Sequence, residues 1–386
     1  MRIAHLITRM IVGGAQENTL FNCVDLQREY GDEVLLISGP SLGPEGDLLC
    51  RTDGDLGIEI AMVDSLRRSI NPLRDSQAYF QIRRLISEFK PDVVHTHSAK
   101  AGILGRAAAW NLGVPAIVHT VHGAPFHEYQ PHFARKLFQL AEKWAAKRCH
   151  HIISVADAMT QRMVNANVAK EEKFSTIYSG MDVEPFLTSG SFRSRIRADF
   201  GISDEHVVIG KIARLFHLKG HEDMIRSAKR VVSKYPNVRF LFVGDGLLRD
   251  QLDRQIKDLG LEEYFCFTGL VAPSEVPKLI AAMDVLAHAS YREGLARALP
   301  QALISGVPAV SYDIDGAREV VLDEITGLLV PAGDIERLSD AIEKLVEDAS
   351  YRQALGAEGR RRFADRFRHQ VMTREIRSLY VKLLES

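Results

Sequence analysis

The sequence predicts a two-domain α/β protein in which each domain is a Rossmann-like, doubly wound parallel sheet. Three observations support this prediction. The chain has 386 residues, which is too long for one typical hydrophobic core. Short β-rich runs alternate with amphipathic helical patterns, as expected for parallel strands joined by crossover helices. The alternation lapses at residues 180–190 and then restarts, which indicates a boundary between two similar domains.

The first half of the chain contains six β-rich runs. We expect strands at residues 3–7, 33–38, 92–95, 115–120, 151–155 and 174–178. The helical patterns between them cover about 15–30, 75–90, 99–112, 132–148 and 157–166. Gly13 and Gly14 lie in the first strand-to-helix turn, where backbone amides could approach a diphosphate. The full dinucleotide pattern G-x-G-x-x-G is absent there, so a purely structural turn is an equal alternative.

The second half repeats the pattern. We expect strands at 207–212, 238–243, 265–268, 285–288, 309–311 and 328–330. The expected helices are 221–234, 247–259, 336–348 and 352–363. A last amphipathic helix, near 370–384, has no strand after it.

Composition narrows the possible functions. A net charge of -1 gives no reason to expect nucleic acid as a partner. The four cysteines are far apart and show no metal-ligand spacing, which fits a reduced cytoplasmic protein. The N-terminal apolar run is too short for a signal peptide, and no run is long enough to span a membrane.

The segment from Ser290 to Pro308 is the strongest candidate for an anion-binding site. We expect a helix that begins at Glu293, whose first amides, at Gly294 and Leu295, would receive an anion. Gln301 would share a helix face with Glu293, because two helical turns take about 7.2 residues. Pro300 should kink this helix.

Two cations are expected beside that site. Arg214 and Lys219 follow the 207–212 strand and precede the next helix. Fixed cations there can neutralise a diphosphate without a metal, whereas solvated loop cations are the alternative. We interpret Asp245 as a helix N-cap after Gly244, and Asp313–Gly316 as a turn whose Gly316 amide approaches a donor. A metal held by Asp313 and Asp315 is a minor alternative.

Histidines gather at the ends of two expected strands in the first half. His95 and His97 end one of them, and His119 and His122 lie at the end of the next. Such strand ends bind ligands in parallel sheets. Zinc is a competing explanation, although no H-E-x-x-H motif is present. The third explanation is that these histidines are simply hydrogen-bonded at the strand ends.

The expected helix near residues 133–148 combines apolar residues with a basic face. An acidic membrane surface could attract that face. An ordinary solvated helix face is the alternative.

Taken together, these motifs resemble the family-four retaining glycosyltransferases of the GT-B fold over essentially the whole chain. The motifs are Gly13-Gly14, Val94–His97, His119–Gly123, Arg214-x4-Lys219-Gly220, Gly244-Asp245-Gly246, Phe267–Gly269, Arg292–Gly294 and Gly327–Pro331. The resemblance implies two domains that face each other across a cleft. The acceptor domain would be residues 1–185 with a returning helix at 366–386, and the donor domain would be 186–365.

The resemblance also implies a role for each site residue. Arg214 and Lys219 would contact the diphosphate, and Glu293 the sugar hydroxyls. His122 would lie near the anomeric centre, with His95 and His97 on the acceptor side. The amides of Gly294 and Leu295 would contact phosphate. The remaining donor-binding residues would be Gly13, Gly14, Gly244, Gly269, Leu270, Val271 and Gln301, of which 269–271 hold the base through backbone groups.

One residue departs from the family pattern, because Gln301 stands where the family has a second glutamate. A neutral hydrogen bond to ribose contributes about 0.5–1.5 kcal/mol, against about 1.5–3 for a charged one, so weaker donor binding is expected.

The expected function is retaining, metal-independent transfer of a sugar from a nucleotide-diphosphate sugar to an acceptor hydroxyl, with no cofactor. A carbohydrate or lipid-linked acceptor in surface polysaccharide or glycolipid synthesis, with the protein at the cytoplasmic face of a membrane, is implied by the resemblance. The alternatives are a nucleotide-sugar epimerase of the same fold and a catalytically inactive sugar-nucleotide-binding protein. A dehydrogenase is disfavoured, because the dinucleotide fingerprint is missing and the paired cations suit a diphosphate.

Overall fold

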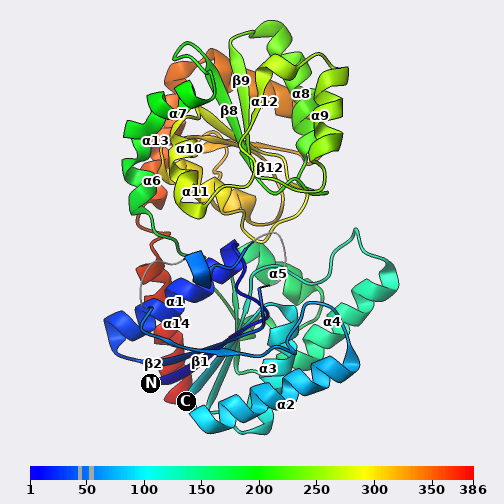
Figure 1. Ribbon diagram of the computed structural model, residues 1–386, viewed down its shortest axis with the longest axis vertical. Coiled ribbons are helices and arrows are strands. Elements are labelled where there is room, and N and C mark those ends of the chain that lie inside the picture. Colours follow the sequence, from blue (N-terminus) through cyan, green and yellow to red (C-terminus); the bar gives the residue numbers. More distant parts are fainter. Residues whose placement is uncertain (42–45, 52–55) are drawn as a thin grey trace. The chain divides into compact units, whose positions relative to one another are not determined.

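The computed structural model describes residues 1–41, 46–51 and 56–386 (Figure 1). The chain forms two compact units. Unit 1 comprises Met1–Met181 and Phe367–Ser386, and unit 2 comprises Asp182–Arg366. Each unit is a parallel sheet with helices on its faces.

Unit 1 contains a seven-stranded parallel sheet with the order β3-β2-β1-β4-β5-β6-β7. Its strands are β1 Arg2–Ile7, β2 Glu33–Ser38, β3 Glu59–Met62, β4 Val93–His97, β5 Ala116–Val121, β6 His151–Ser154 and β7 Phe174–Thr176. Its helices are α1 Gly14–Tyr30, α2 Pro72–Phe89, α3 Ala99–Asn111, α4 His132–Ala146, α5 Asp157–Asn165 and α14 His369–Leu384. Short 3-10 helices cover Leu49–Arg51 and Glu171–Lys173.

The last helix, α14, is part of the core of unit 1. Its buried residues Met372, Ile376 and Tyr380 join the same apolar cluster as Leu20 and Cys23 of α1. Figure 1 shows α14, in red, beside α1, in blue. The returning helix that the sequence suggested therefore packs on unit 1.

Unit 2 contains a six-stranded parallel sheet with the order β10-β9-β8-β11-β12-β13. Its strands are β8 Val207–Ile212, β9 Val238–Val243, β10 Phe265–Phe267, β11 Val285–His288, β12 Ala309–Tyr312 and β13 Gly327–Val330. Its helices are α6 Glu184–Thr188, α7 Arg193–Asp199, α8 His221–Lys234, α9 Arg249–Asp258, α10 Val276–Ala281, α11 Ala298–Ile304, α12 Ile335–Glu347 and α13 Ala349–Phe363. Its 3-10 helices are Ser189–Phe192, Glu262–Tyr264, Pro273–Glu275 and Asp315–Glu319.

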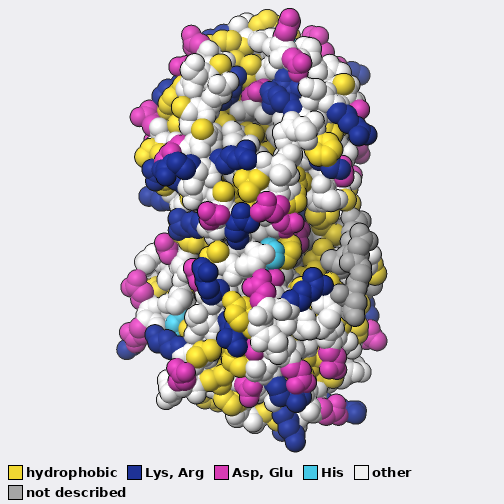
Figure 2. All heavy atoms as spheres, turned by 90° about the vertical axis from the view of Figure 1, so that its left-hand side faces the viewer, with side chains coloured by type: hydrophobic (Ala, Val, Ile, Leu, Met, Phe, Trp, Pro, Cys, Tyr) yellow, Lys and Arg dark blue, Asp and Glu magenta, His cyan; other side chains and the backbone are white. Residues whose placement is uncertain are grey.

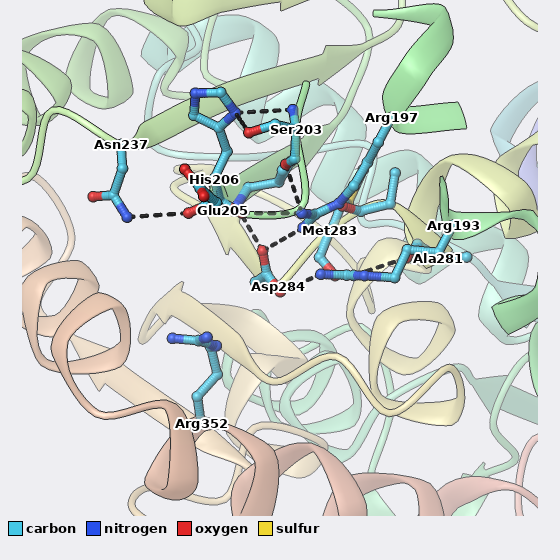
Figure 3. A network of polar contacts seen from close by, with 12 residues as sticks. Arg193, Arg197, Ser203, Glu205, His206, Asn237, Ala281, Met283, Asp284 and Arg352 are labelled. Carbon is cyan, nitrogen blue, oxygen red and sulfur yellow. Dashed lines mark hydrogen bonds and ion pairs between the residues drawn. The ribbon is translucent and has the colours of Figure 1, made fainter. Parts of the chain in front are cut away.

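A buried ionic network fastens α7 to the sheet of unit 2 (Figure 3). Asp284, just before β11, accepts hydrogen bonds from Arg193 at 2.6 Å and from Arg197 at 2.7 Å. Its carboxylate also accepts from the Val208 amide of β8 at 2.7 Å. Arg197 is almost fully buried and donates further to the carbonyls of Ala282 and Ser203. One carboxylate therefore connects a helix with two strands.

Charge of both signs is spread over the face of the protein that Figure 2 shows. Figure 2 shows basic and acidic side chains interspersed on one face, which agrees with the nearly neutral sequence. Among the described residues, no helix is both long and apolar enough to cross a bilayer.

Most predicted elements are confirmed to within a few residues, but β3, α6, α7 and α10 were not predicted. The largest error concerns α11, which begins at Ala298 rather than at Glu293. Pro300 explains this start: it has no amide hydrogen for the Ala296 carbonyl, so the helix cannot extend further back. The first amides of a helix have no carbonyl partner within the helix, so a proline costs no hydrogen bond there. Pro300 therefore fits the first turn of α11 and does not kink the helix.

Candidate active site

The predicted donor residues of unit 2 lie at one edge of its sheet. Arg214 follows β8, Gly244 follows β9, Gly269 follows β10 and Glu293 follows β11. Because all these strands are parallel, their carboxyl ends meet at the same edge. The sequence-predicted donor residues of this unit therefore do converge.

Two glycines allow the loops at this edge to lie close together. Gly220, at φ +64°, precedes α8, and a Cβ there would lie 1.8 Å from the Ala289 carbonyl oxygen. At Gly244, which has φ +135°, an added Cβ would lie 2.2 Å from the Ala213 carbonyl oxygen. Any side chain at either position would push the β8 loop away from its neighbour.

Glu293 is the centre of the polar contacts at this edge. Its Oε1 lies 2.5 Å from Lys219 Nζ and 3.4 Å from His288 Nε2. Its backbone amide donates to Asp315 Oδ2 at 2.7 Å. Burial raises the pKa of Glu293, but its contacts with His288 and Lys219 outweigh this effect and hold the pKa well below the usual range. Glu293 is therefore a carboxylate at neutral pH, a pure hydrogen-bond acceptor.

Lys211 is a further cation that we did not predict. It lies on β8 with its side chain almost fully buried, and its Nζ has no hydrogen-bond partner among the described residues. Burial and the nearby charge of Lys219 lower its pKa to about 7, against the opposing effect of Glu293. The signal was present in the sequence as a lysine on the same face of a strand as Ile209.

Arg214 leaves the end of β8 on a braced loop. Its backbone carbonyl accepts from His221 Nε2 at 3.0 Å, and its guanidinium carbon lies 5.0 Å from the centre of the Phe216 ring. The His221 contact connects the loop to the first residue of α8. The backbone at Arg214 is therefore held in place.

The loop after β10 and the segment before α11 differ in their local structure. Gly269 has φ +69° and pairs with Gly244 in an isolated bridge, and Leu270 and Val271 extend beyond it, with Leu270 exposed. Gly294 and Leu295 precede α11 rather than open it, so their amides are not helix-terminal donors. Gln301 is inside α11 while Glu293 is outside, so the expected shared helix face is wrong.

Two smaller expectations about this edge are also wrong. Asp245 caps no helix: its carboxylate accepts from the adjacent Gly246 amide at 2.7 Å, and α9 begins only at Arg249. The Gly316 amide donates to the Gly294 carbonyl at 3.2 Å, which excludes that amide from donor contact in this geometry.

The acidic residues of the 313–315 turn are also engaged within the chain. Asp313 forms an ion pair with Arg318, and Asp315 holds the Glu293 backbone. A metal held between these two carboxylates would have to displace both interactions.

In unit 1, Gly13 is the N-cap of α1, and the helix begins at Gly14, which was expected to lie in the turn before it. His122 follows β5 and is half-buried. His95 and His97, expected on the acceptor side, are fully buried instead. His95 hydrogen-bonds Tyr380 and Thr120, so these strand-end histidines support the site from within.

Three of the histidines come close enough to raise the question of a metal. Nitrogens of His5, His95 and His97 lie within 4.8 Å of one another. Both His95 nitrogens already hydrogen-bond Tyr380 and Thr120, so a metal would have to displace one of them. His5 and Tyr380 were not predicted as members of this cluster, although His5 interrupts an otherwise apolar strand.

Comparison with known proteins places the chain in a family. Residues 12–185 match the glycosyltransferase family 4 model, and residues 192–362 match the model of glycosyl transferases group 1. The chain is a family-four glycosyltransferase of the GT-B fold. It is therefore a transferase of the glycosyl-transferring class.

Curated relatives of this glycosyltransferase align over most of their length. The UDP-Gal:alpha-D-GlcNAc-diphosphoundecaprenol alpha-1,3-galactosyltransferase of Escherichia coli is 28% identical over 90% of this chain and 88% of its own. The capsular polysaccharide biosynthesis glycosyltransferase CapM of Staphylococcus aureus is 28% identical over 85% of this chain and 86% of its own.

Solved structures agree on the fold. HepE of Anabaena in complex with UDP-glucose superposes with a TM-score of 0.82 at 23% identity, covering 99% of this chain and 100% of that one. The sucrose-phosphate synthase of Thermosynechococcus elongatus superposes with a TM-score of 0.83 at 17% identity, covering 100% and 99%.

Proposed function

We propose that this glycosyltransferase moves a sugar from a nucleotide-diphosphate sugar to an acceptor hydroxyl, with net retention at the anomeric carbon and without a metal ion. The observation that carries the proposal is the placement of Arg214, Lys219 and an ionised Glu293 at one edge of the unit 2 sheet. This edge offers cations for a diphosphate and an acceptor for sugar hydroxyls.

The barrier to transfer lies in breaking the anomeric bond while negative charge develops on the departing diphosphate. Arg214 and Lys219 stand on loops held by Gly220 and His221, so they stabilise that charge with little reorganisation. Two fixed cations supply the positive charge that a divalent ion supplies in metal-dependent diphosphate sites, so this site does not need a metal. Glu293 fixes the sugar ring by accepting hydrogen bonds from its hydroxyl groups.

His122 orients the sugar at the anomeric centre in this proposal, and the backbone of residues 269–271 holds the base. Gly13 and Gly14 let the diphosphate approach the start of α1. HepE was solved in complex with UDP-glucose, and the Escherichia coli relative uses UDP-Gal, which supports a nucleotide sugar as donor.

The acceptor is a carbohydrate or lipid-linked carbohydrate of surface polysaccharide or glycolipid synthesis. The Escherichia coli and Staphylococcus aureus relatives, which act on a diphosphoundecaprenol and in capsule formation, support this class of acceptor.

Helix α4 fits an acidic membrane surface at the cytoplasmic face. It exposes Phe133, Leu137, Leu140 and Trp144 at helical spacing, and Arg148 stacks over Trp144 at 3.8 Å. Lys136, Lys143 and Lys147 lie on the same helical segment.

A double variant tests the diphosphate role. Arg214→Ala with Lys219→Ala should abolish transfer while circular dichroism and the melting temperature stay close to those of the wild type. Near-native turnover would refute the role. Full activity in a chelator is expected, and strict dependence on manganese would instead favour Asp313 and Asp315 as metal ligands.

A vesicle assay tests the membrane role of α4. Phe133→Ser with Leu137→Ser should reduce co-sedimentation with phosphatidylglycerol vesicles. Leu73→Ser with Phe80→Ser, which alters exposed apolar residues of α2, is the matched control and should not. Equal loss in both variants would contradict a specific role for α4.

Product analysis separates the two alternatives. An epimerase would convert the nucleotide sugar without any acceptor, whereas an inactive binder would neither transfer nor hydrolyse the donor. Arg214, Lys219, Glu293 and His122 are all present, which favours transfer over an inactive binder.

A further inference from the structure

A chain of hydrogen-bonded imidazoles runs from the interior of unit 1 to His122. His5 Nδ1 lies 3.0 Å from His97 Nε2, and His97 Nδ1 lies 3.1 Å from His122 Nε2. The rings of His5 and His97 are stacked, as are those of His97 and His122. The three residues come from β1, β4 and the loop after β5, adjacent strands of the sheet.

His5, the innermost of the three histidines, determines on which ring nitrogen each of the other two carries its hydrogen. His5 is fully buried, and its Nε2 has no hydrogen-bond partner among the described residues. Burial lowers the pKa of His5 to about 3, so the ring is neutral and carries one hydrogen. Orphaned buried N–H groups are rarer in proteins than under-satisfied acceptors. The hydrogen of His5 is therefore on Nδ1, and Nε2 keeps its lone pair.

The ring of His97, the next histidine outward, carries its hydrogen on the nitrogen that faces His122. His5 Nδ1–H donates to His97 Nε2, so Nε2 of His97 is the acceptor. Burial, together with the neighbouring His95 and His5, holds the pKa of His97 well below the usual range, so this ring is also neutral. Its one hydrogen must then be on Nδ1, from which it donates to His122 Nε2.

We propose that His5 and His97 are positioning residues that hold His122 with its Nε2 as acceptor and its hydrogen on Nδ1. This proposal rests on the role of His122 at the anomeric centre, which is part of the proposed function. In this form His122 offers Nδ1–H as a hydrogen-bond donor to a sugar oxygen. It does not offer Nδ1 as a base, so its task is to orient the sugar rather than to abstract a proton.

The tautomer itself can be measured without any assay of activity. Long-range proton–nitrogen correlation spectra of histidine-labelled protein distinguish protonated from unprotonated ring nitrogens. The His122 signals are assigned by their absence in a His122→Gln spectrum. We expect a protonated Nδ1 and an unprotonated Nε2, and the reverse pattern would overturn the proposal whatever the activity of any variant.

Kinetic measurements then test whether the hydrogen bond from His97 to His122 affects the rate of transfer. His97→Leu should lower kcat about 10–100-fold with little change in the donor KM, by analogy with the loss of a residue that orients a metal-bound histidine. His97→Asn should recover much of this loss, because its amide can still donate to His122. His151→Leu is the control, since it removes a strand histidine of unit 1 that hydrogen-bonds Ser175 instead of His97 or His122, and it should leave kcat nearly unchanged.

Three outcomes separate the positioning role of His97 from the proposed role of His122 at the anomeric centre. Equal losses in the His97→Leu and His151→Leu variants, or no rescue by asparagine, would reduce His97 to a structural role and overturn the proposal. Full activity of His122→Gln would refute the proposed role of His122, while the spectra would still decide the tautomer. Melting temperatures of all variants identify any that fail to fold.

Discussion

Lys211 is a basic residue that β8 carries into the apolar core of unit 2. Its pKa is lowered from 10.5 to about 7 by burial and by Lys219, so the folded state disfavours the charged form. Below pH 7 the lysine is charged in both states and the burial penalty is complete, on the order of 5 kcal/mol. As the pH rises from 7 to 10.5, the unfolded chain holds more protons than the folded one, and the penalty disappears.

We therefore predict that Lys211→Met stabilises unit 2 most below pH 7 and progressively less up to pH 10. Methionine has a similar length and needs no hydrogen bond, so the packing around Phe242 should be kept. Urea unfolding of both proteins at pH 6, 8 and 10 checks the prediction. A difference in unfolding free energy that does not change with pH would contradict it.

Gln301 is the residue that departs from the family pattern. A glutamate there would offer ribose a charged acceptor in place of a neutral one, a gain of about 1 kcal/mol. We predict that Gln301→Glu binds UDP or another nucleoside diphosphate about five-fold more tightly in calorimetry. Gln353→Glu, on the exposed surface of α13, is the control for the added charge. A large loss of affinity would show that the site is organised around glutamine.

At the residue scale, the sequence was informative where a residue stands at the end of a strand. Arg214, Lys219 and Glu293 were predicted because loops at strand ends carry function. Lys211 and His5 were missed because they lie within strands, where side chains were assumed to be apolar core, and His288 was missed although it ends β11. Their roles depend on neighbours brought in by the sheet order, such as the His5–His97 contact, and sequence spacing cannot show these.

At the element scale, the buried Asp284 network holds α7 against β8 and β11 (Figure 3). Asp284→Asn would leave Arg197 buried without a counter-charge, and breaking such a pair costs about 3–5 kcal/mol. We predict this loss in the unfolding free energy of unit 2, measured by urea denaturation. Glu88→Gln, which breaks the exposed Arg84–Glu88 pair, should have little effect. Equal effects of the two substitutions would contradict the buried role.

The elements also show what a local pattern can and cannot predict. The long periodic helix α8 was predicted to the residue, because its apolar stripe is unambiguous. The start of α11 was missed because the helix was expected to begin at Glu293, directly after the strand, whereas Pro300 restricts where the helical hydrogen bonds can begin. Short elements such as α7 and α10 carry too few residues for a periodic signal.

At the scale of the whole molecule, each unit has its own apolar core, and α14 completes the core of unit 1 although it follows unit 2 in the chain. Ile376 of α14 lies in the first core, and Ile342 of α12 lies in the second. Truncating a buried isoleucine to alanine costs about 2–5 kcal/mol, because the cavity is only partly refilled.

We therefore predict that each truncation destabilises only the unit that contains it. Ile376→Ala should lower amide hydrogen-exchange protection in peptides from residues 1–181 and 367–386, while peptides from 182–366 keep theirs. Ile342→Ala should do the opposite. If Ile376→Ala instead weakened both sets of peptides equally, the units would unfold as one, and α14 would stabilise the whole chain rather than the unit against which it packs.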